Sequence, residues 1–185
     1  MKFKALLLIA LLLFSFNVKG QVAIKTNALG WATASVNAGV EVGIGKKSTF
    51  NVTGSINPFE FKDGKKWRHW AVLPEYRYWF CEKFHGSFIG IHAIGMQYNM
   101  AKVLTGIYPE LSDSRYQGWG VGAGLAYGCQ WALSKHWSLE LTAGVGYVYS
   151  KYDKYPCAEC GTRLEKGSKH YFGPTKAALS VLYVF

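Results

Sequence analysis

The chain has 185 residues and a net charge of +10, and half of its residues are hydrophobic. Such a length suffices for one domain with a sizeable interior. After residue 20, no apolar stretch approaches the roughly 18 residues that a membrane helix requires. The sequence therefore excludes a membrane protein built from helices.

Residues 1–20 contain the three regions of a signal peptide in the expected order. Lysines occupy two of the first four positions, and residues 5–16 are almost wholly apolar. Val18 and Gly20 then place small residues before an expected cleavage site ahead of Gln21. The apolar run is too short for a spanning helix, and a retained N-terminal anchor is the alternative. We expect Sec-type export and a single domain over residues 21–185.

The exported part is rich in residue types that suit membrane interfaces and tightly curved sheets. The whole chain has 12 Tyr, 7 Trp and 21 Gly. A closed β-barrel can satisfy every backbone polar group inside a bilayer without any helix. A soluble β-sandwich is the alternative, and the pattern along the chain has to decide between the two.

Apolar residues alternate with small or polar ones through most of the chain, as expected for strands. In segment 137–150 the apolar face begins at Trp137 and ends at Tyr147 and Tyr149, with aliphatic residues between them. Aromatic residues at both ends of an apolar band are typical of a strand that faces lipid. The predicted strands are 22–33, 36–44, 49–56, 70–80, 86–99, 118–131, 137–150 and 176–185.

Two of these segments are irregular. Segment 22–33 is mixed, with Lys25, Asn27, Leu29 and Trp31 on one side. In segment 70–80, Pro74 cannot donate a hydrogen bond to a neighbouring strand. We expect a bulge or locally irregular pairing at Pro74.

Short and long connections alternate along the chain after a short first loop at 34–35. Segments 45–48, 81–85 and 134–136 are expected to be periplasmic turns, and segments 57–68, 100–117 and 151–171 to be outer loops. This asymmetry is typical of membrane barrels, and a sandwich gives no reason for it. We therefore predict an all-β fold, an eight-stranded antiparallel up-and-down transmembrane β-barrel of the outer membrane.

An eight-stranded barrel has an interior just wide enough for side chains to fill it. Buried charges must pair, because their desolvation is otherwise very costly. The charged residues on the predicted inner faces are expected to form an ion-pair network: Glu41, Glu75, Arg77, Glu140 and Lys176. A gated proton or ion path is the alternative to this structural role. His92, if it points inward, is expected to be hydrogen-bonded rather than to act as a ligand or base.

The four cysteines fall into two groups. Cys157 and Cys160 lie in the last long connection, and export to an oxidising compartment allows a disulfide between them. Free thiols, or metal or redox chemistry with His170 as the nearby further ligand, are the alternatives. Cys81 and Cys129 are expected to be free, and we expect no metal and no cofactor.

Basic residues gather in two of the predicted outer loops. They are Lys62, Lys65, Lys66 and Arg68 in the second loop and Arg163, Lys166 and Lys169 in the fourth. Positive charge attracts phosphates and acidic sugars. At an outer surface this favours contact with outer-membrane lipid and lipopolysaccharide rather than nucleic acid, with a solvated rim as the alternative.

The chain resembles an uncharacterised family of small Gram-negative outer-membrane barrel proteins. The resemblance is carried by residues 25–27 (Lys-Thr-Asn), by the run Pro-Glu-Tyr-Arg-Tyr-Trp-Phe at 74–80, and by residues 171–176. Genes of this family often lie near fimbrillin-type genes, which implies an outer-membrane location and a link to fimbriae. The resemblance implies no catalytic residues.

The last residues alternate in the manner of the signal read by the barrel-assembly machinery. The residues concerned are Leu179, Val181, Tyr183 and Phe185. This segment is also a possible handle for β-augmentation, in which an exposed strand pairs with a partner's sheet.

The leading functional hypothesis is a non-enzymatic outer-membrane protein with a structural or surface-interaction role. Assistance in fimbrial assembly or anchoring is a narrower form, which rests on the resemblance. A lipid-modifying enzyme is an alternative and predicts a hydrogen-bonded Ser and His in a rim pocket; Ser114, His69 or His170, and Glu110 are available. A narrow channel is another alternative and predicts a continuous water-filled bore.

Overall fold

The computed structural model describes residues 21–59, 66–101, 114–156 and 162–185. The predicted signal peptide, residues 1–20, lies outside them. The strands are β1 (Val22–Asn27), β2 (Val36–Gly43), β3 (Ser48–Asn57), β4 (Lys66–Trp79), β5 (Gly86–Ala101), β6 (Arg115–Ala132), β7 (Trp137–Tyr155) and β8 (Glu165–Val184). A short helix, α2 (Ala28–Ala32), follows β1. No helix among these residues is both long and apolar enough to cross a membrane.

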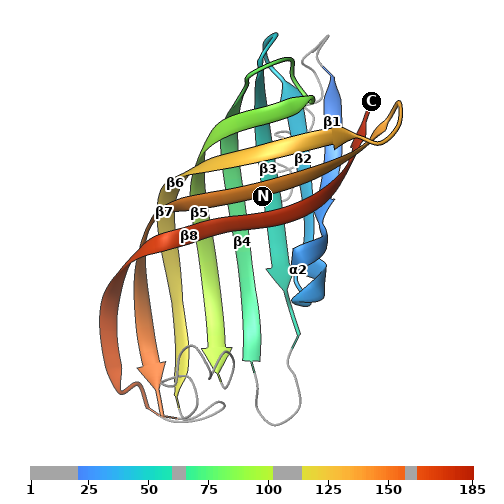
Figure 1. The fold of residues 1–185 in the computed structure, drawn as a ribbon. Helices are drawn as coiled ribbons and strands as arrows, with labels where there is room; N and C mark the ends of the chain where they lie inside the picture. The colour runs from blue at the N-terminus through green and yellow to red at the C-terminus, as the bar shows by residue number, and fades with distance from the viewer. Residues whose placement is uncertain (1–20, 60–65, 102–113, 157–161) are drawn as a thin grey trace, which may run out of the picture.

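The eight strands form one antiparallel up-and-down sheet that closes in a ring (Figure 1). Each strand pairs with the next, and β1 closes the ring against β8. The predicted all-β class, strand number and strand order are confirmed. The connections 44–47, 80–85 and 133–136 lie together at one end, which we call the short-turn end (Figure 1).

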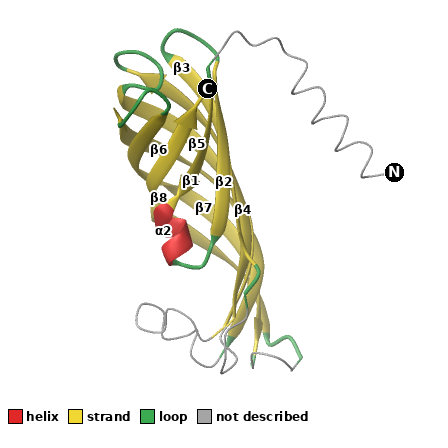
Figure 2. Cartoon of the chain, turned by 90° about the vertical axis from the view of Figure 1, so that its right-hand side faces the viewer, coloured by secondary structure: helices red, strands yellow, loops and turns green. Residues whose placement is uncertain are grey.

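The strands lengthen steadily along the chain, from six residues in β1 to 20 in β8. As a result, β1 pairs only with the last part of β8, Ser180 to Val184. Next to the part of β8 that precedes Ser180, the neighbour is α2 rather than a strand (Figure 1). The later strands project past α2 at the end away from the short turns (Figure 2).

The prediction of a strand over 22–33 is wrong after Asn27, because the side chain of Asn27 starts a helix. Its Oδ1 accepts a hydrogen bond from the backbone N–H of Leu29 at 3.1 Å, which caps α2. The same oxygen accepts from the N–H of Leu179 at 3.1 Å, and Nδ2 donates to the carbonyl of Ala177 at 3.2 Å. Asn27 therefore satisfies the backbone of β8 where β1 stops.

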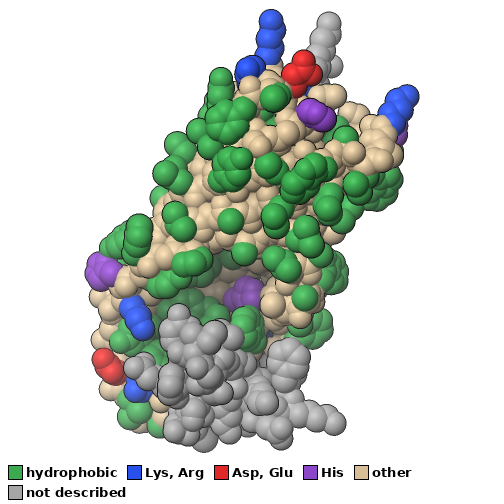
Figure 3. All heavy atoms as spheres, viewed as in Figure 1, with side chains coloured by type: hydrophobic (Ala, Val, Ile, Leu, Met, Phe, Trp, Pro, Cys, Tyr) green, Lys and Arg blue, Asp and Glu red, His purple; other side chains and the backbone are tan. Residues whose placement is uncertain are grey.

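Polarity in this ring is the reverse of that in a water-soluble core. Large apolar side chains cover the outside; Ile91 and Leu125 are each 63 % exposed. The largest fully buried side chains include Arg77, Glu41 and Glu140. Figure 3 shows hydrophobic side chains spread over the outer faces of the strands, with charged side chains mainly towards the ends.

The locally irregular pairing predicted at Pro74, as the alternative to a bulge, is found. Leu73 and Pro74 have no partners in β5, yet β4 and β5 keep the same register on both sides of this gap. Of the two alternatives, the structure therefore has interrupted pairing rather than a bulge at Pro74.

A bulge instead lies at Pro174. Gly144 pairs with Lys176 and Val145 with Pro174, so Thr175 is an extra residue in β8. Proline is tolerated at a bulge because no ladder hydrogen bond needs its missing N–H. The bulge lets the neighbouring residues Thr175 and Lys176 both line the ring interior.

The strands continue into segments that we predicted to be outer loops. Residues 151–155 belong to β7 and residues 165–171 to β8, and residues 151–154 pair with 165–168. The alternation is weaker there because polar and charged residues occur on both faces. Cross-strand aromatic contacts support the extension; the rings of Tyr116 and Tyr152 are 5.5 Å apart.

Candidate functional site

Six charged side chains from five strands meet inside the ring. They are Lys25 of β1, Glu41 of β2, Glu75 and Arg77 of β4, Glu140 of β7 and Lys176 of β8. We call them the charged network. Every side chain in it is at least 89 % buried, Lys176 being the most accessible at 11 % exposed. Three positive and three negative charges cancel, as burial requires.

Arg77 occupies the centre of the charged network. Its Nη1 lies 2.7 Å from Glu140 Oε2 and 2.8 Å from Glu41 Oε2, and its Nε lies 2.6 Å from Glu75 Oε2. The lysines flank this arrangement. Lys25 Nζ lies 2.6 Å from Glu41, and Lys176 Nζ lies 2.6 Å from Glu75. One guanidinium thus binds all three carboxylates, since its planar fork offers several donors at once.

Neutral donors complete the coordination of the carboxylates. Thr49 Oγ1 donates to Glu41 at 2.5 Å, and Thr142 Oγ1 donates to Glu140 at 2.9 Å. Asn51 Nδ2 donates to Glu75 at 3.3 Å. These bonds fix the carboxylates and help to offset their desolvation.

The structure brings together all five residues that the sequence analysis placed in the network. It adds Lys25, which we had assigned to the mixed first segment. The signal for Lys25 was present: Val22 and Ile24 alternate with Ala23 and Lys25. We missed it because the pattern was read across the later helix, which breaks the alternation.

An aromatic layer fills the ring between the charged network and the short-turn end. Trp79, Phe88 and Leu182 are fully buried, and Phe84 of the turn is 6 % exposed. The Arg77 guanidinium lies over the Phe88 ring, 4.3 Å from its centre. Figure 1 shows the sheet closed around this end.

The glycine-rich inner face of β6 makes room for this layer. A Cβ atom built at Gly128 would lie 2.5 Å from Cζ of Phe88. Any side chain there would force the Phe88 ring to move. Glycine at this position is thus required by close packing rather than by backbone conformation.

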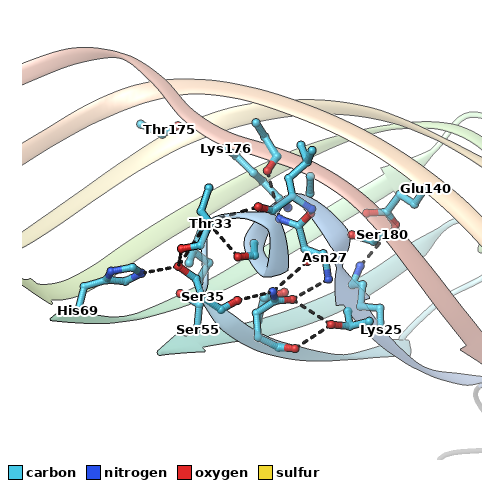
Figure 4. Close-up of a pocket in the computed structure, with 18 of the residues that line it drawn as sticks. Lys25, Asn27, Thr33, Ser35, Ser55, His69, Glu140, Thr175, Lys176 and Ser180 are labelled. Atoms are coloured by element: carbon cyan, nitrogen blue, oxygen red, sulfur yellow. Dashed lines mark hydrogen bonds and ion pairs between the residues drawn. The ribbon is translucent and has the colours of Figure 1, made fainter. Parts of the chain in front are cut away.

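On the other side of the charged network lies a cavity of about 380 Å³ (Figure 4). Arg77, Glu140, Lys25 and Lys176 form its floor. Hydroxyl and amide side chains from β1, β2, β3, β8 and the connection after α2 form much of its wall: Thr26, Asn27, Thr33, Ser35, Asn37, Thr53, Ser55, Thr175 and Ser180. Leu29 and Gly30 of α2 and Ala177 of β8 complete one side.

His92 points inward beside the cavity. Its Nε2 lies 2.9 Å from Oγ1 of Thr175, the extra residue of the bulge. Its Nδ1 and the Oε1 of the neighbouring Glu75 find no hydrogen-bond partner among the described residues. His92 thus lies inside the ring and is hydrogen-bonded through Nε2, as predicted, while its Nδ1 makes no hydrogen bond to the described residues.

A second histidine reaches the cavity wall. His69 Nε2 lies 3.3 Å from Oγ of Ser35, as drawn in Figure 4. Ser35 follows Ala34, whose φ of 56° is the left-handed conformation that favours glycine. The Nδ1 of His69 has no partner within the part of the chain that the structure describes.

A family model matches residues 5–185 of the chain. The chain belongs to this family, DUF3575, a protein family of unknown function. The prediction that the chain belongs to an uncharacterised family is therefore confirmed. No curated protein and no solved structure matches the chain.

Among the described residues, the serine and histidine candidates for an enzyme do not pair as proposed in this DUF3575 member. His69 pairs with Ser35 rather than with Ser114, and Glu110 lies outside the described residues. His170 lies on the outer face of β8 and hydrogen-bonds Tyr147 Oη. Neither histidine therefore has a described carboxylate as hydrogen-bond partner.

Cys157 and Cys160 lie outside the described residues, so their pairing stays a prediction. Cys81 is exposed and free, and Cys129 is also free, with its Sγ 2.8 Å from Ser87 Oγ. Within the described ranges, no group of three or more His, Cys, Asp or Glu could hold a metal ion.

The basic residues are placed differently from the prediction. Lys62 and Lys65 lie outside the described residues. Four of the remaining five, which we had placed in loops, belong to strands: Lys66 and Arg68 to β4 and Lys166 and Lys169 to β8. Arg163 precedes β8, and its Nη1 lies 3.6 Å from the Asp153 carboxylate. The positive charge therefore sits on the projecting strands.

The C-terminal segment does not offer the open edge expected for β-augmentation. Val181 and Tyr183 pair with both β1 and β7. Leu179 pairs with β7, and its N–H binds Asn27 on the other side. Phe185 N–H donates to the carbonyl of Val22 at 2.9 Å. That role is contradicted, because both edges of this segment are already bonded.

Proposed function

We propose that the ring is a transmembrane β-barrel and that this DUF3575 protein is an integral outer-membrane protein, exported through the Sec route. Its role is structural or surface-interacting rather than enzymatic. The observation that carries the proposal is the reversed polarity of the ring, in which apolar side chains face outward around a buried charged network.

Water would penalise the outer surface heavily. Each Å² of exposed apolar area costs about 25 cal/mol relative to burial, and this outer face is apolar all around the ring. Hydrocarbon around the ring removes this penalty. A closed sheet can lie in hydrocarbon because all its backbone N–H and C=O groups are hydrogen-bonded between strands. Exposed aromatic side chains occur both near the short-turn end, as at Phe80, Trp131 and Trp137, and further from it, as at Trp70, Trp119 and Tyr147. Aromatic residues towards both ends of the outer face support two membrane interfaces.

The interior supports an anchor rather than a channel. The aromatic layer and the charged network fill the ring in series at the short-turn end. An ion path would have to break the contacts that Arg77 makes to three carboxylates. This arrangement therefore gives no support to a narrow channel, which the sequence analysis kept as an alternative.

The projecting parts of β4 to β8 are the proposed contact surface. They carry Arg68, Lys166 and Lys169, which suit the phosphates of lipopolysaccharide. Surface proteins are the further proposed partners. Participation in fimbrial assembly or anchoring is the narrower form, supported only by the sequence resemblance. The outward-facing alternation of Val181, Tyr183 and Phe185 supports recognition by the barrel-assembly machinery.

One observation favours a second candidate function, hydrolysis of a lipid ester. The hydrogen-bonded pair Ser35 and His69 lies in a cavity, as a serine nucleophile and its base would. Against it, no described carboxylate orients His69 through Nδ1. Labelling by a fluorophosphonate probe, lost in Ser35→Ala, would show that Ser35 is a reactive nucleophile, and release of fatty acid from a lipid ester by the same protein would show the hydrolysis. Absence of labelling in the folded protein would exclude a reactive Ser35.

The membrane proposal is tested by expressing the full chain in a Gram-negative host. We expect the protein in the outer-membrane fraction after a urea wash. We also expect its unheated form to migrate faster than its boiled form on a denaturing gel, as closed barrels in membranes do. Recovery of the folded chain as a water-soluble monomer from a detergent-free extract would contradict the proposal.

A further inference from the structure

We propose that the cavity binds the uncharged, hydroxyl-bearing head group of a single-chain amphiphile, which enters sideways between β8 and α2. This inference rests on the proposed membrane position of the ring. It adds a ligand site to a protein otherwise proposed as an anchor.

The sideways entrance follows from the unequal lengths of the two strands that close the ring. β1 ends at Asn27, whereas β8 continues for 15 residues before Ser180. Leu29 and Gly30 line the cavity from one side of this gap, and Lys176 and Ala177 from the other. Figure 3 shows the molecule hollowed beside β8 on this face.

The entrance lies at the depth of the apolar band. Ala177 pairs with Ala143 of β7, which lies between Trp137 and Tyr149 on the lipid-facing side. Leu29 lines the cavity and is still 44 % exposed, and Phe172, further along β8, is 79 % exposed. An alkyl chain can therefore stay against these side chains while its head group enters the ring.

The floor of the cavity selects against charge. All three cations of the charged network are already bound to its three carboxylates. A charged head group would lose its hydration without gaining an uncommitted counter-ion. A neutral head group avoids this cost.

The walls suit hydroxyl groups. Ser55, Thr53, Thr26 and Thr175 present side-chain oxygens from three different strands. His69 and Ser35, which hydrogen-bond each other, add further polar atoms to the lining. The cavity volume of about 380 Å³ is within the usual range for a small-molecule site.

The test uses three probes with the same eight-carbon chain: octyl β-glucoside, octyl sulfate and octyltrimethylammonium. The full chain is reconstituted in lipid nanodiscs with its threonine methyl groups isotopically labelled, and the probes are added at concentrations that leave the discs intact. We expect saturable NMR shifts at Thr26, Thr53 and Thr175 with the glucoside. Thr142, buried beside Glu140 away from the cavity, is the internal control.

Ser55→Phe should fill the cavity and weaken the glucoside's affinity by roughly tenfold or more. Ile56→Phe is the matched control, because Ile56 is the next residue of β3 and points outward with 51 % exposure. It should leave the affinity unchanged. Retained heat-dependent gel mobility shows that each variant is folded.

Three outcomes would overturn the inference: no saturable shift at the cavity threonines, equal binding of the charged probes, or full binding by folded Ser55→Phe. The membrane proposal is tested separately, by whether the chain enters the nanodisc bilayer before any probe is added. A chain that does not enter the bilayer overturns that proposal and, with it, the sideways entrance.

Discussion

The guanidinium of Arg77 binds the carboxylate of Glu140 through two nitrogens, Nη1 at 2.7 Å and Nη2 at 3.1 Å. This two-point contact joins β4 to β7 across the ring interior, 63 residues apart in sequence. Both side chains are 1 % exposed. Removing either charge would therefore destabilise the ring, because the other charge would stay buried without a partner.

Glu140→Gln should destabilise the protein by about 3 kcal/mol or more, because it leaves an excess positive charge buried beside Arg77. The measurement is the free energy of unfolding by urea in lipid vesicles. Glu165→Gln is the control, since Glu165 lies exposed at the start of β8 and its loss should change little. A cost below that of the control would show that the network does not hold the ring together.

Lys25→Met and Glu41→Gln should be coupled, because Lys25 Nζ and Glu41 Oε2 lie 2.6 Å apart. Each single change leaves the charged network with one unbalanced charge, whereas the double change restores neutrality. We expect the double variant to be more stable than the sum of the two single effects predicts, by about 1–3 kcal/mol. Additive effects in a double-mutant cycle of unfolding free energies would mean that Lys25 lies outside the network.

Much of this fold could be predicted from alternation alone. Segments such as β7 keep one apolar and one polar face over many residues, so strand number, order and inward charges follow from a period of two. Glu41, Glu75, Arg77, Glu140 and Lys176 were identified in this way. Alternation says which face a residue occupies, and charge balance then says that opposite charges must meet.

Alternation could not predict features that depend on contacts between distant segments. Asn27 ends β1 because its side chain caps both α2 and the backbone of β8, about 150 residues away. The bulge at Pro174 was likewise missed, because the last strand was predicted to begin only at residue 176. The pairing of Ser35 with His69 depends on the turn after α2, which the sequence analysis had read as part of a strand and a short loop.

Asn27→Ala should open the seam between β1 and β8, because it removes the acceptor for the N–H of both Leu29 and Leu179. Loss of a helix cap together with a strand contact should cost about 1–2 kcal/mol. Amide hydrogen exchange at Leu179 is the specific measurement and should become faster. Leu141, which pairs with Leu179 from β7, should keep its protection. Unchanged exchange at Leu179 would mean that Asn27 does not close the seam.

A pair of leucines with nearly equal exposure separates lipid from water as the surroundings of the ring. Leu125 in the middle of β6 is 63 % exposed, and Leu133 in the turn after β6 is 65 % exposed. In water, arginine at either position should change stability by no more than about 0.5 kcal/mol. In a bilayer, Leu125→Arg should cost about 2–4 kcal/mol near the midplane, whereas Leu133→Arg near the interface should cost about 0–1 kcal/mol.

The measurement is the unfolding free energy of both variants in lipid vesicles, with heat-dependent gel mobility as the check on folding. The two leucines are nearly equally exposed, so a difference in stability between the two variants reports whether hydrocarbon or water surrounds each position. Equal and small effects would place the middle of β6 in water and would contradict the membrane proposal. A larger loss for Leu125→Arg would locate the hydrocarbon around the centre of the ring, at the depth where the cavity opens between β8 and α2.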